Sequence, residues 1–196
     1  MFKPEKFQKK RTSFIAGGQT TSQDNLSSNT ITVTTADRIK ESYLAIENIS
    51  GIPTQGEQHR IVTIKAIVTL DFILAVLAEE KIVNLYIAVY VIGKKTIAEL
   101  SSLHESQDIQ NLFFLVNTRI YAKTGINEML TAAVSENWRV KIAHTHTKII
   151  LMETVQGNHY VVEGSGNMSQ NGQYEQYIFE NNKLVYDFHK NWMEEL

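Results

Sequence analysis

The sequence predicts an α/β fold in which helices flank a mixed β-sheet. One observation behind this prediction is that β-branched runs alternate with helical segments from Arg60 onward. A second is the turn-like stretch at 154–158, which separates two strands near the C-terminus and adds antiparallel pairing to the sheet. A third is size, since 196 residues with 43% hydrophobic side chains suffice for one domain with a sizeable core.

Periodicity and end signals assign the elements in chain order. A helix is expected over residues 36–48, and the glycines and proline of 51–56 end it. The strands expected next are 61–68, 82–92 and 112–116, and the helices are 70–80, 95–103 and 126–136. Residues 138–153 are expected to form one long strand, followed by strands at 159–163 and 176–179 and a final amphipathic helix at 183–194.

Residues 1–35 are expected to form a flexible segment in front of a domain that covers residues 36–196. Residues 1–11 are basic, and residues 17–35 are rich in Ser, Thr, Gln and Gly with few large apolar side chains. A basic terminus of this kind is more often solvated than bound to phosphates, although it has the charge to contact them.

Composition excludes several classes of protein. The net charge of −2 gives no overall attraction to nucleic acid or acidic lipid, so such binding requires a local patch. The absence of cysteine excludes disulfides, thiolate chemistry and cysteine-ligated metals. The first 20 residues have no apolar core, and the longest uncharged apolar run, 82–93, is shorter than the about 20 residues that cross a bilayer. We therefore expect no membrane span and a cytoplasmic location.

The densest chemistry lies in residues 144–148, His-Thr-His-Thr-Lys. If 138–153 is one strand, alternation places His144, His146 and Lys148 on one face and Glu153 on the other. Residues two apart in a strand are separated by about 7 Å, so the imidazole of His146 and the ammonium of Lys148 can reach one phosphate group.

A second polar stretch follows the next strand at Gly164, Ser165, Gly166 and Asn167. The two glycines remove side-chain bulk, so that backbone and ligand can approach each other closely. Ser165 and Asn167 offer a hydroxyl and an amide donor to an anion.

Taken together, His146-x-Lys148, Glu153 and Gly164-Ser165-x-Asn167 resemble the motif of the phospholipase D superfamily. In that motif an Asp stands where this chain has Glu153, and the spacer before the glycine is shorter. Glu175 resembles the acidic residue that orients the catalytic histidine of the partner motif. The resemblance covers roughly residues 144–180 and implies a phospholipase D-like fold for the domain.

The resemblance also implies phosphodiester cleavage without a metal or another cofactor. His146 would attack phosphorus and form a phosphohistidine, while Lys148 and Asn167 hold the non-bridging oxygens. Ser165, Gly164, Gly166 and His144 would line the substrate site. The family uses two motifs that face each other, and this chain has one, so the resemblance implies a homodimer.

Three functions remain open at this point. An endonuclease acting on DNA or RNA is favoured, since a basic arm is present and no membrane-binding stretch is. The alternatives are a phospholipase-like or other phosphodiesterase and a non-catalytic nucleic-acid-binding module of the same fold. A metal site at His144, His146 and His159 is not expected, because no further ligand follows at a known spacing. Lys94 and Lys95 are expected to be solvated at a helix start.

Overall fold

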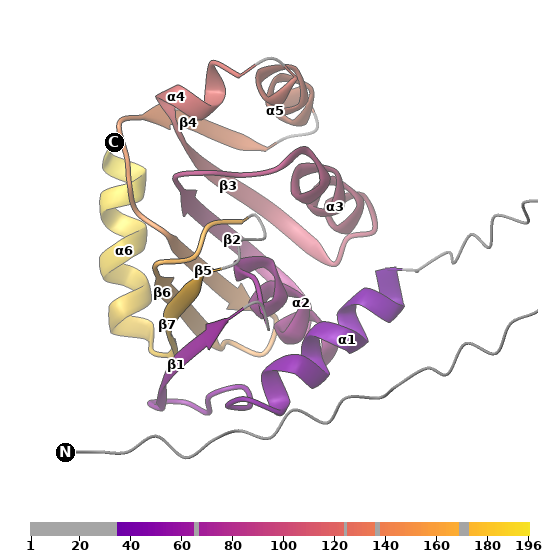
Figure 1. The fold of residues 1–196 in the computed structure, drawn as a ribbon, viewed down its shortest axis with the longest axis vertical. Helices are drawn as coiled ribbons and strands as arrows, with labels where there is room; N and C mark the ends of the chain where they lie inside the picture. Colours follow the sequence, from indigo (N-terminus) through magenta and orange to yellow (C-terminus); the bar gives the residue numbers. More distant parts are fainter. Residues whose placement is uncertain (1–34, 65–66, 124, 136–137, 169–172) are drawn as a thin grey trace, which may run out of the picture. The chain divides into compact units, whose positions relative to one another are not determined.

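The computed structural model describes residues 35–64, 67–123, 125–135, 138–168 and 173–196. Within them, seven strands form one sheet in the order β1-β7-β6-β5-β2-β3-β4, with helices on both faces (Figure 1). The sheet is mixed, because β2 pairs in parallel with β3 and antiparallel with β5. The predicted α/β fold is thus confirmed. The segment expected to be flexible lies, except for Thr35, outside the described residues.

The expected elements appear within a few residues of their predicted bounds, except in residues 138–153, and the short helix α4 was not predicted. The first six are α1 (Thr35–Glu47), β1 (Gln58–Ile64), α2 (Thr69–Glu79), β2 (Ile82–Val89), α3 (Lys94–Glu105) and β3 (Ile109–Asn117). The next three are α4 (Thr118–Tyr121), α5 (Ile126–Ser135) and β4 (Arg139–Ala143). The last four are β5 (Ile149–Thr154), β6 (His159–Gly164), β7 (Tyr174–Asn181) and α6 (Lys183–Glu195).

Two apolar clusters fill the two faces of the sheet. The larger cluster joins the sheet to α1, α2, α3 and α5, and the smaller one lies beneath α6 on the opposite face (Figure 1). Alternation along β5 explains the division, since Ile150 and Met152 face the larger cluster and Ile149 and Leu151 face α6. None of the helices in the described ranges combines the length and the apolar character that crossing a bilayer requires.

One edge of the sheet gathers the ends of several strands. β2, β3 and β4 are parallel, so their carboxyl ends lie at the same edge. β6 runs in the same direction as β2, because both are antiparallel to β5. The segments that follow these four strands therefore meet at this edge, which we call the carboxyl edge. They are residues 90–96, 117–123, 125–128, 143–148 and 164–168.

Candidate active site

Residues 144–148 do not form part of a strand, so the prediction of one long strand at 138–153 was wrong. β4 lies at the end of the sheet beside β3, whereas β5 lies between β2 and β6. The chain must therefore cross the carboxyl ends of β3 and β2 between the two strands, and residues 144–148 are that crossing. The polar motif is thus placed on the carboxyl edge rather than on a face of the sheet.

The crossing segment is fixed by Asn117, at the end of β3. The Nδ2 group of this buried side chain donates to the carbonyl oxygen of Thr145 at 2.6 Å, and its Oδ1 accepts from the backbone N–H of Arg119 at 2.8 Å. Inside the segment, the Thr145 and Thr147 hydroxyl oxygens are 2.7 Å apart. The two threonines are half-buried and His144 and His146 are exposed, so the histidines project outward.

His146 and Lys148 lie together on the outer side of the segment. The Lys148 ammonium donates to Nδ1 of His146 at 3.1 Å and to the carbonyl oxygen of the same residue at 2.9 Å. Both groups lie against Tyr90, which follows β2: the Tyr90 ring centroid is 4.6 Å from the imidazole centroid and 5.6 Å from Lys148 Nζ. The tyrosine ring therefore lies against both the imidazole and the ammonium.

The turn at Gly164–Gly166 lies directly against β7. The backbone N–H of Ser165 donates to the Gln176 carbonyl oxygen, and the N–H of Gln176 donates to Ser165 Oγ, each at 3.0 Å. A Cβ at position 164 would collide with that carbonyl oxygen, and one at 166 would collide with the Tyr177 hydroxyl. Both glycines are therefore required for close approach of two backbone segments.

Ser165 also binds Glu175, since its hydroxyl donates to the carboxylate. Glu175 lies near enough to Lys148 to raise the pKa of that ammonium, whereas burial, the larger effect, lowers it. The carboxylate expected to orient a histidine is thus joined to the serine and acts electrostatically on the lysine.

Asn167 connects the turn to β2 and α2. Its Oδ1 accepts from the backbone N–H of Val91, the residue after Tyr90, at 3.0 Å. The Thr69 hydroxyl bonds to the carbonyl oxygens of Gly166 and Asn167, each at 3.0 Å. Because Oδ1 is the acceptor of an N–H, Nδ2 is the other atom of the amide and remains available to donate to an anion.

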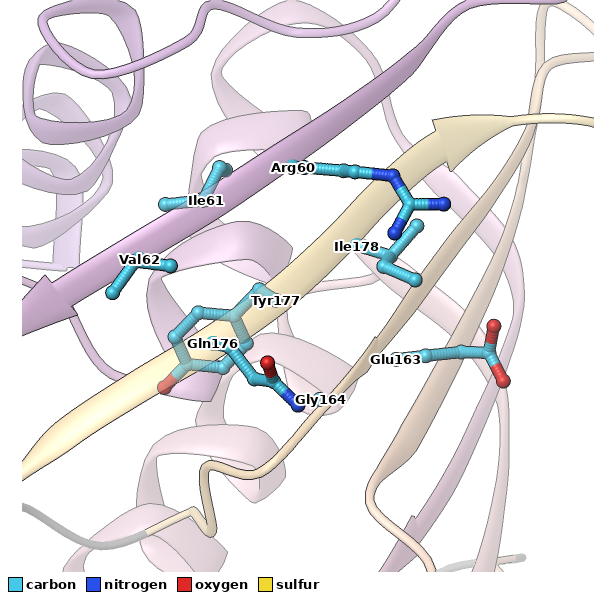
Figure 2. Close-up of a pocket in the computed structure, with 8 residues that line it drawn as sticks. All are labelled: Arg60, Ile61, Val62, Glu163, Gly164, Gln176, Tyr177 and Ile178. Atoms are coloured by element: carbon cyan, nitrogen blue, oxygen red, sulfur yellow. The ribbon is translucent and has the colours of Figure 1, made fainter. Parts of the chain in front are cut away.

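His146, Lys148, Gly164 and Ser165 line one cavity of about 470 Å³, together with Thr147, Ile149, Glu163 and Gln176. A second cavity of about 470 Å³ adjoins it and shares Glu163, Gly164 and Gln176 (Figure 2). It lies over β1, β7 and β6, and Arg60, Val62 and Ile178 line its other side. The predicted residues His146, Lys148, Ser165 and Gly164 are thus brought to one cavity.

Glu163 is a lining residue that the sequence did not single out. Its Oε1 lies 3.0 Å from Nε2 of His189 in α6, and Nδ1 of His189 accepts from the Trp192 indole at 3.0 Å. Since Nδ1 is an acceptor, Nε2 carries the proton and donates to Glu163. Two further positions, Asn117 and Tyr90, were also missed, because their contacts are made only in the folded chain.

Gly166, Asn167, Glu175 and His144 are not among the residues that line this cavity: the first three belong to or contact the turn that holds Ser165, and His144 is exposed on the crossing segment. Glu153 and His159 lie farther from it. Glu153 faces α6 as alternation required, but it is not directed to solvent: it accepts from Asn84 Nδ2 at 2.7 Å and from the Tyr186 hydroxyl at 3.4 Å. His159 begins β6, so it lies at the opposite edge from His146, with its ring 5.0 Å from that of Tyr186. Among the described residues, no group of three or more His, Asp or Glu is placed to hold a metal ion.

Comparison with known proteins gives matches among solved structures only. No protein-family model matches the sequence, and no curated protein matches it. Polyphosphate kinase from Porphyromonas gingivalis superposes with a TM-score of 0.53 and 13% identity, over 69% of this chain and 25% of that chain. Nuc, a phospholipase D family member from Salmonella typhimurium, superposes with a TM-score of 0.51 and 9% identity, over 71% of this chain and 93% of that chain. NucT from Helicobacter pylori superposes with a TM-score of 0.51 and 13% identity, over 71% of this chain and 95% of that chain.

At these identities the likeness demonstrates a common fold, not a common activity. The aligned region spans nearly all of the Salmonella and Helicobacter proteins and a quarter of the polyphosphate kinase. The sequence resemblance rested on residues 144–180 alone, whereas the structural likeness extends over about 70% of the chain. The motif and the structural likeness therefore agree that this chain has a phospholipase D-like α/β fold.

Proposed function

We propose that this protein is a metal-independent phosphodiesterase that cleaves nucleic-acid backbones as an endonuclease, through a phosphohistidine at His146. The observation that carries the proposal is the placement of His146 and Lys148 beside Ser165 and Gly164 around one open cavity, on a phospholipase D fold. An imidazole, an ammonium and a hydroxyl directed to one place are suited to a phosphate group, since they combine a nucleophile with anion donors.

In the proposed mechanism, each of these groups has a separate task. The Nε2 lone pair of His146 attacks phosphorus, the phosphorus–oxygen bond to the leaving group breaks, and a second histidine protonates the leaving oxygen. Lys148 and the free Nδ2 of Asn167 bind the non-bridging oxygens, on which negative charge must be stabilised. Water then attacks phosphorus, the phosphorus–nitrogen bond to His146 breaks, and the second histidine takes the proton from the water.

The second histidine is proposed to be His146 of another copy of the chain. Support comes from exposed apolar side chains beside the cavities. Ile61 and Tyr177 face the larger core, so their neighbours Val62 and Gln176 face the α6 side of the sheet. There Val62 is 71% exposed, and Phe188 on the outer face of α6 is 67% exposed. Apolar exposure of this kind is typical of a protein interface.

A second copy on this surface would come close to the His146 cavity. The cavity in Figure 2 is lined by Val62 and also by Glu163 and Gly164, which line the His146 cavity as well. A partner that covers the cavity in Figure 2 therefore has access to the His146 cavity. This geometry supports a homodimer in which the two motifs face each other across a two-fold axis.

The test is nicking of supercoiled plasmid DNA in the presence of EDTA. We expect cleavage by the natural chain and none by His146→Ala, while His159→Ala, at the opposite edge of the sheet, retains activity. Activity on lipid or small diesters alone would show that the protein is a phosphodiesterase of another kind and not a nuclease. Binding of DNA without any turnover would favour a non-catalytic nucleic-acid-binding module.

A further inference from the structure

The carboxyl edge carries positive charge well beyond Lys148. Its further basic side chains, all exposed, are Lys94, Lys95, Arg119 and Lys123. None of the four forms an ion pair with an acidic residue in the described ranges. The acidic residues nearby include Glu128, in the first turn of α5, Glu163, which binds His189, and Glu175, which binds Ser165. This edge therefore has an excess of unneutralised cations in a chain whose net charge is −2.

The opposite edge of the sheet has the reverse character. Its basic residues are paired: Lys81 with Asp108 at 3.3 Å, Arg139 with Glu194 at 3.5 Å and Lys183 with Asp187 at 2.6 Å. The acidic residues near that edge also include Glu57, Glu79, Glu80, Glu105, Glu153 and Glu180. Within the described residues, charge is thus separated between the two edges, and the carboxyl edge attracts a polyanion more strongly than the opposite edge does.

The cations of the carboxyl edge follow one continuous path. Asn117 joins the His146 segment to the backbone of Arg119 at the start of α4, and Lys123 follows directly after α4. Lys94 lies across Gly125, where a Cβ would be 2.7 Å from Lys94 Cε. The path closes through α3, since the Thr96 hydroxyl donates to the Met168 carbonyl oxygen at 3.1 Å, next to Asn167.

This path is too wide for one phosphate group. Neighbouring strands lie about 4.8 Å apart, so the ends of β2 and β4 are about 10 Å apart. A single phosphate held by Lys148 leaves the other cations without a partner. We infer that Arg119, Lys123 and Lys94 bind the phosphates that flank the scissile one in a nucleic-acid strand, an inference that rests on the proposed function. The substrate is accordingly a polymer of phosphodiesters rather than a lipid or a small diester.

The test is binding of a labelled 20-nucleotide oligonucleotide, single-stranded and duplex, to chains that carry His146→Ala. Arg119→Ala/Lys123→Ala is compared with the control Lys81→Ala/Lys183→Ala, which removes two lysines at the opposite edge. Lys94→Ala is a second variant on the other arm of the path. Thermal melting verifies that each variant is folded, and EDTA and a salt series are included.

We expect the Arg119→Ala/Lys123→Ala variant to bind at least one of the two oligonucleotides about tenfold more weakly at low salt, with the control within twofold. The salt slope of log Kd should fall by about 1.4 if the variant no longer neutralises two phosphates of a single strand. Equal losses of affinity in both double variants, or no loss in either, would overturn the inference. This experiment measures binding and requires no turnover. If the natural chain proves inactive but its binding still depends on the carboxyl edge, only the proposed phosphodiesterase activity is contradicted.

Discussion

Nζ of Lys148 lies 3.1 Å from Nδ1 of His146, and both groups rest on the ring of Tyr90. An ammonium is only a donor, so Nδ1 accepts, and a neutral imidazole carries its proton on Nε2. In the proposed mechanism, Nε2 can attack only after this proton has moved. A phosphate that attracts Lys148 away from Nδ1 would permit the change, because Nδ1 is then free to carry the proton.

This relationship makes activity dependent on pH through Lys148. Burial lowers the pKa of Lys148 below that of an ordinary lysine, and Glu175 raises it in part. A required ammonium is present below its pKa and is lost as the pH rises through it. Glu175→Gln removes the group that raises the pKa, so we expect the basic limb of the kcat/KM profile to move to lower pH.

The control for this pH profile is Lys148→Arg, because a guanidinium stays charged at all pH values of the assay. In any activity that this variant retains, the basic limb should be absent up to about pH 10. A limb that stays in place in Glu175→Gln, or moves to higher pH, would contradict the assigned role of Lys148.

Asn117 is expected to position the crossing segment. Asn117→Asp keeps the oxygen that accepts from Arg119 N–H but replaces the donor to the Thr145 carbonyl with a second acceptor. A buried carbonyl without its donor costs about 1–3 kcal/mol, and the segment should move outward. We expect a loss of that size in the free energy of unfolding, measured with urea, and at least a tenfold loss of kcat.

Asn182→Ala is the matched control for this substitution. It removes the N-cap of α6, whose Oδ1 accepts from Leu184 N–H at 3.1 Å, and costs about 1 kcal/mol. Its kcat should remain near that of the natural chain. If both variants lose kcat in proportion to stability, Asn117 has no positioning role beyond its contribution to folding.

Gly164 should not tolerate a side chain. In Gly164→Ala, the new Cβ meets the Gln176 carbonyl oxygen and lies 2.8 Å from Tyr177 Cδ1, so β6 and β7 must separate at the site. Overpacking of this kind costs about 1–3 kcal/mol. Thermal unfolding should show a marked decrease in Tm for Gly164→Ala and little change for Gly93→Ala, whose Cβ has no contact closer than 4.0 Å. Equal Tm values for the two variants would contradict the proposed close approach.

The surface proposed for the partner copy can be tested by charge. Val62→Asp/Phe188→Asp places two carboxylates among exposed apolar groups, and we expect monomers in light scattering together with a loss of nicking activity. Val134→Asp/Val155→Asp alters two valines that are also more than half exposed but lie on α5 and in the β5–β6 turn. A natural chain that is monomeric at assay concentration yet active would rule out a shared site.

The sequence predicted most elements because each has a local signal. The β5–β6 hairpin is an example: Gly157 takes the positive φ of 84° that its turn requires. The break between β4 and β5 has no such signal, because residues 144–148 alternate like a strand. Only the strand order, with β4 and β5 on opposite sides of β2 and β3, forces the chain out of the sheet there.

The candidate site, like the fold, was predicted from the sequence only where its residues form a local pattern. Motif residues lie close in sequence, so His146 with Lys148 and Gly164 with Ser165 could be recognised without coordinates. Asn117 and Tyr90 are separated from His146 by 29 and 56 positions and lie at the ends of different strands, so no local pattern connects them. Their roles depend on parallel strands whose ends meet, which is a property of the tertiary structure.

The central claim is that the His146 imidazole is the nucleophile, and rapid acid-free quenching followed by mass spectrometry of the 144–148 peptide tests it most directly. We predict a phosphorus adduct on His146 during turnover, retained in His144→Ala and absent in His146→Ala. Cleavage of DNA in EDTA with no adduct on His146, or with an adduct on another residue, would contradict the account.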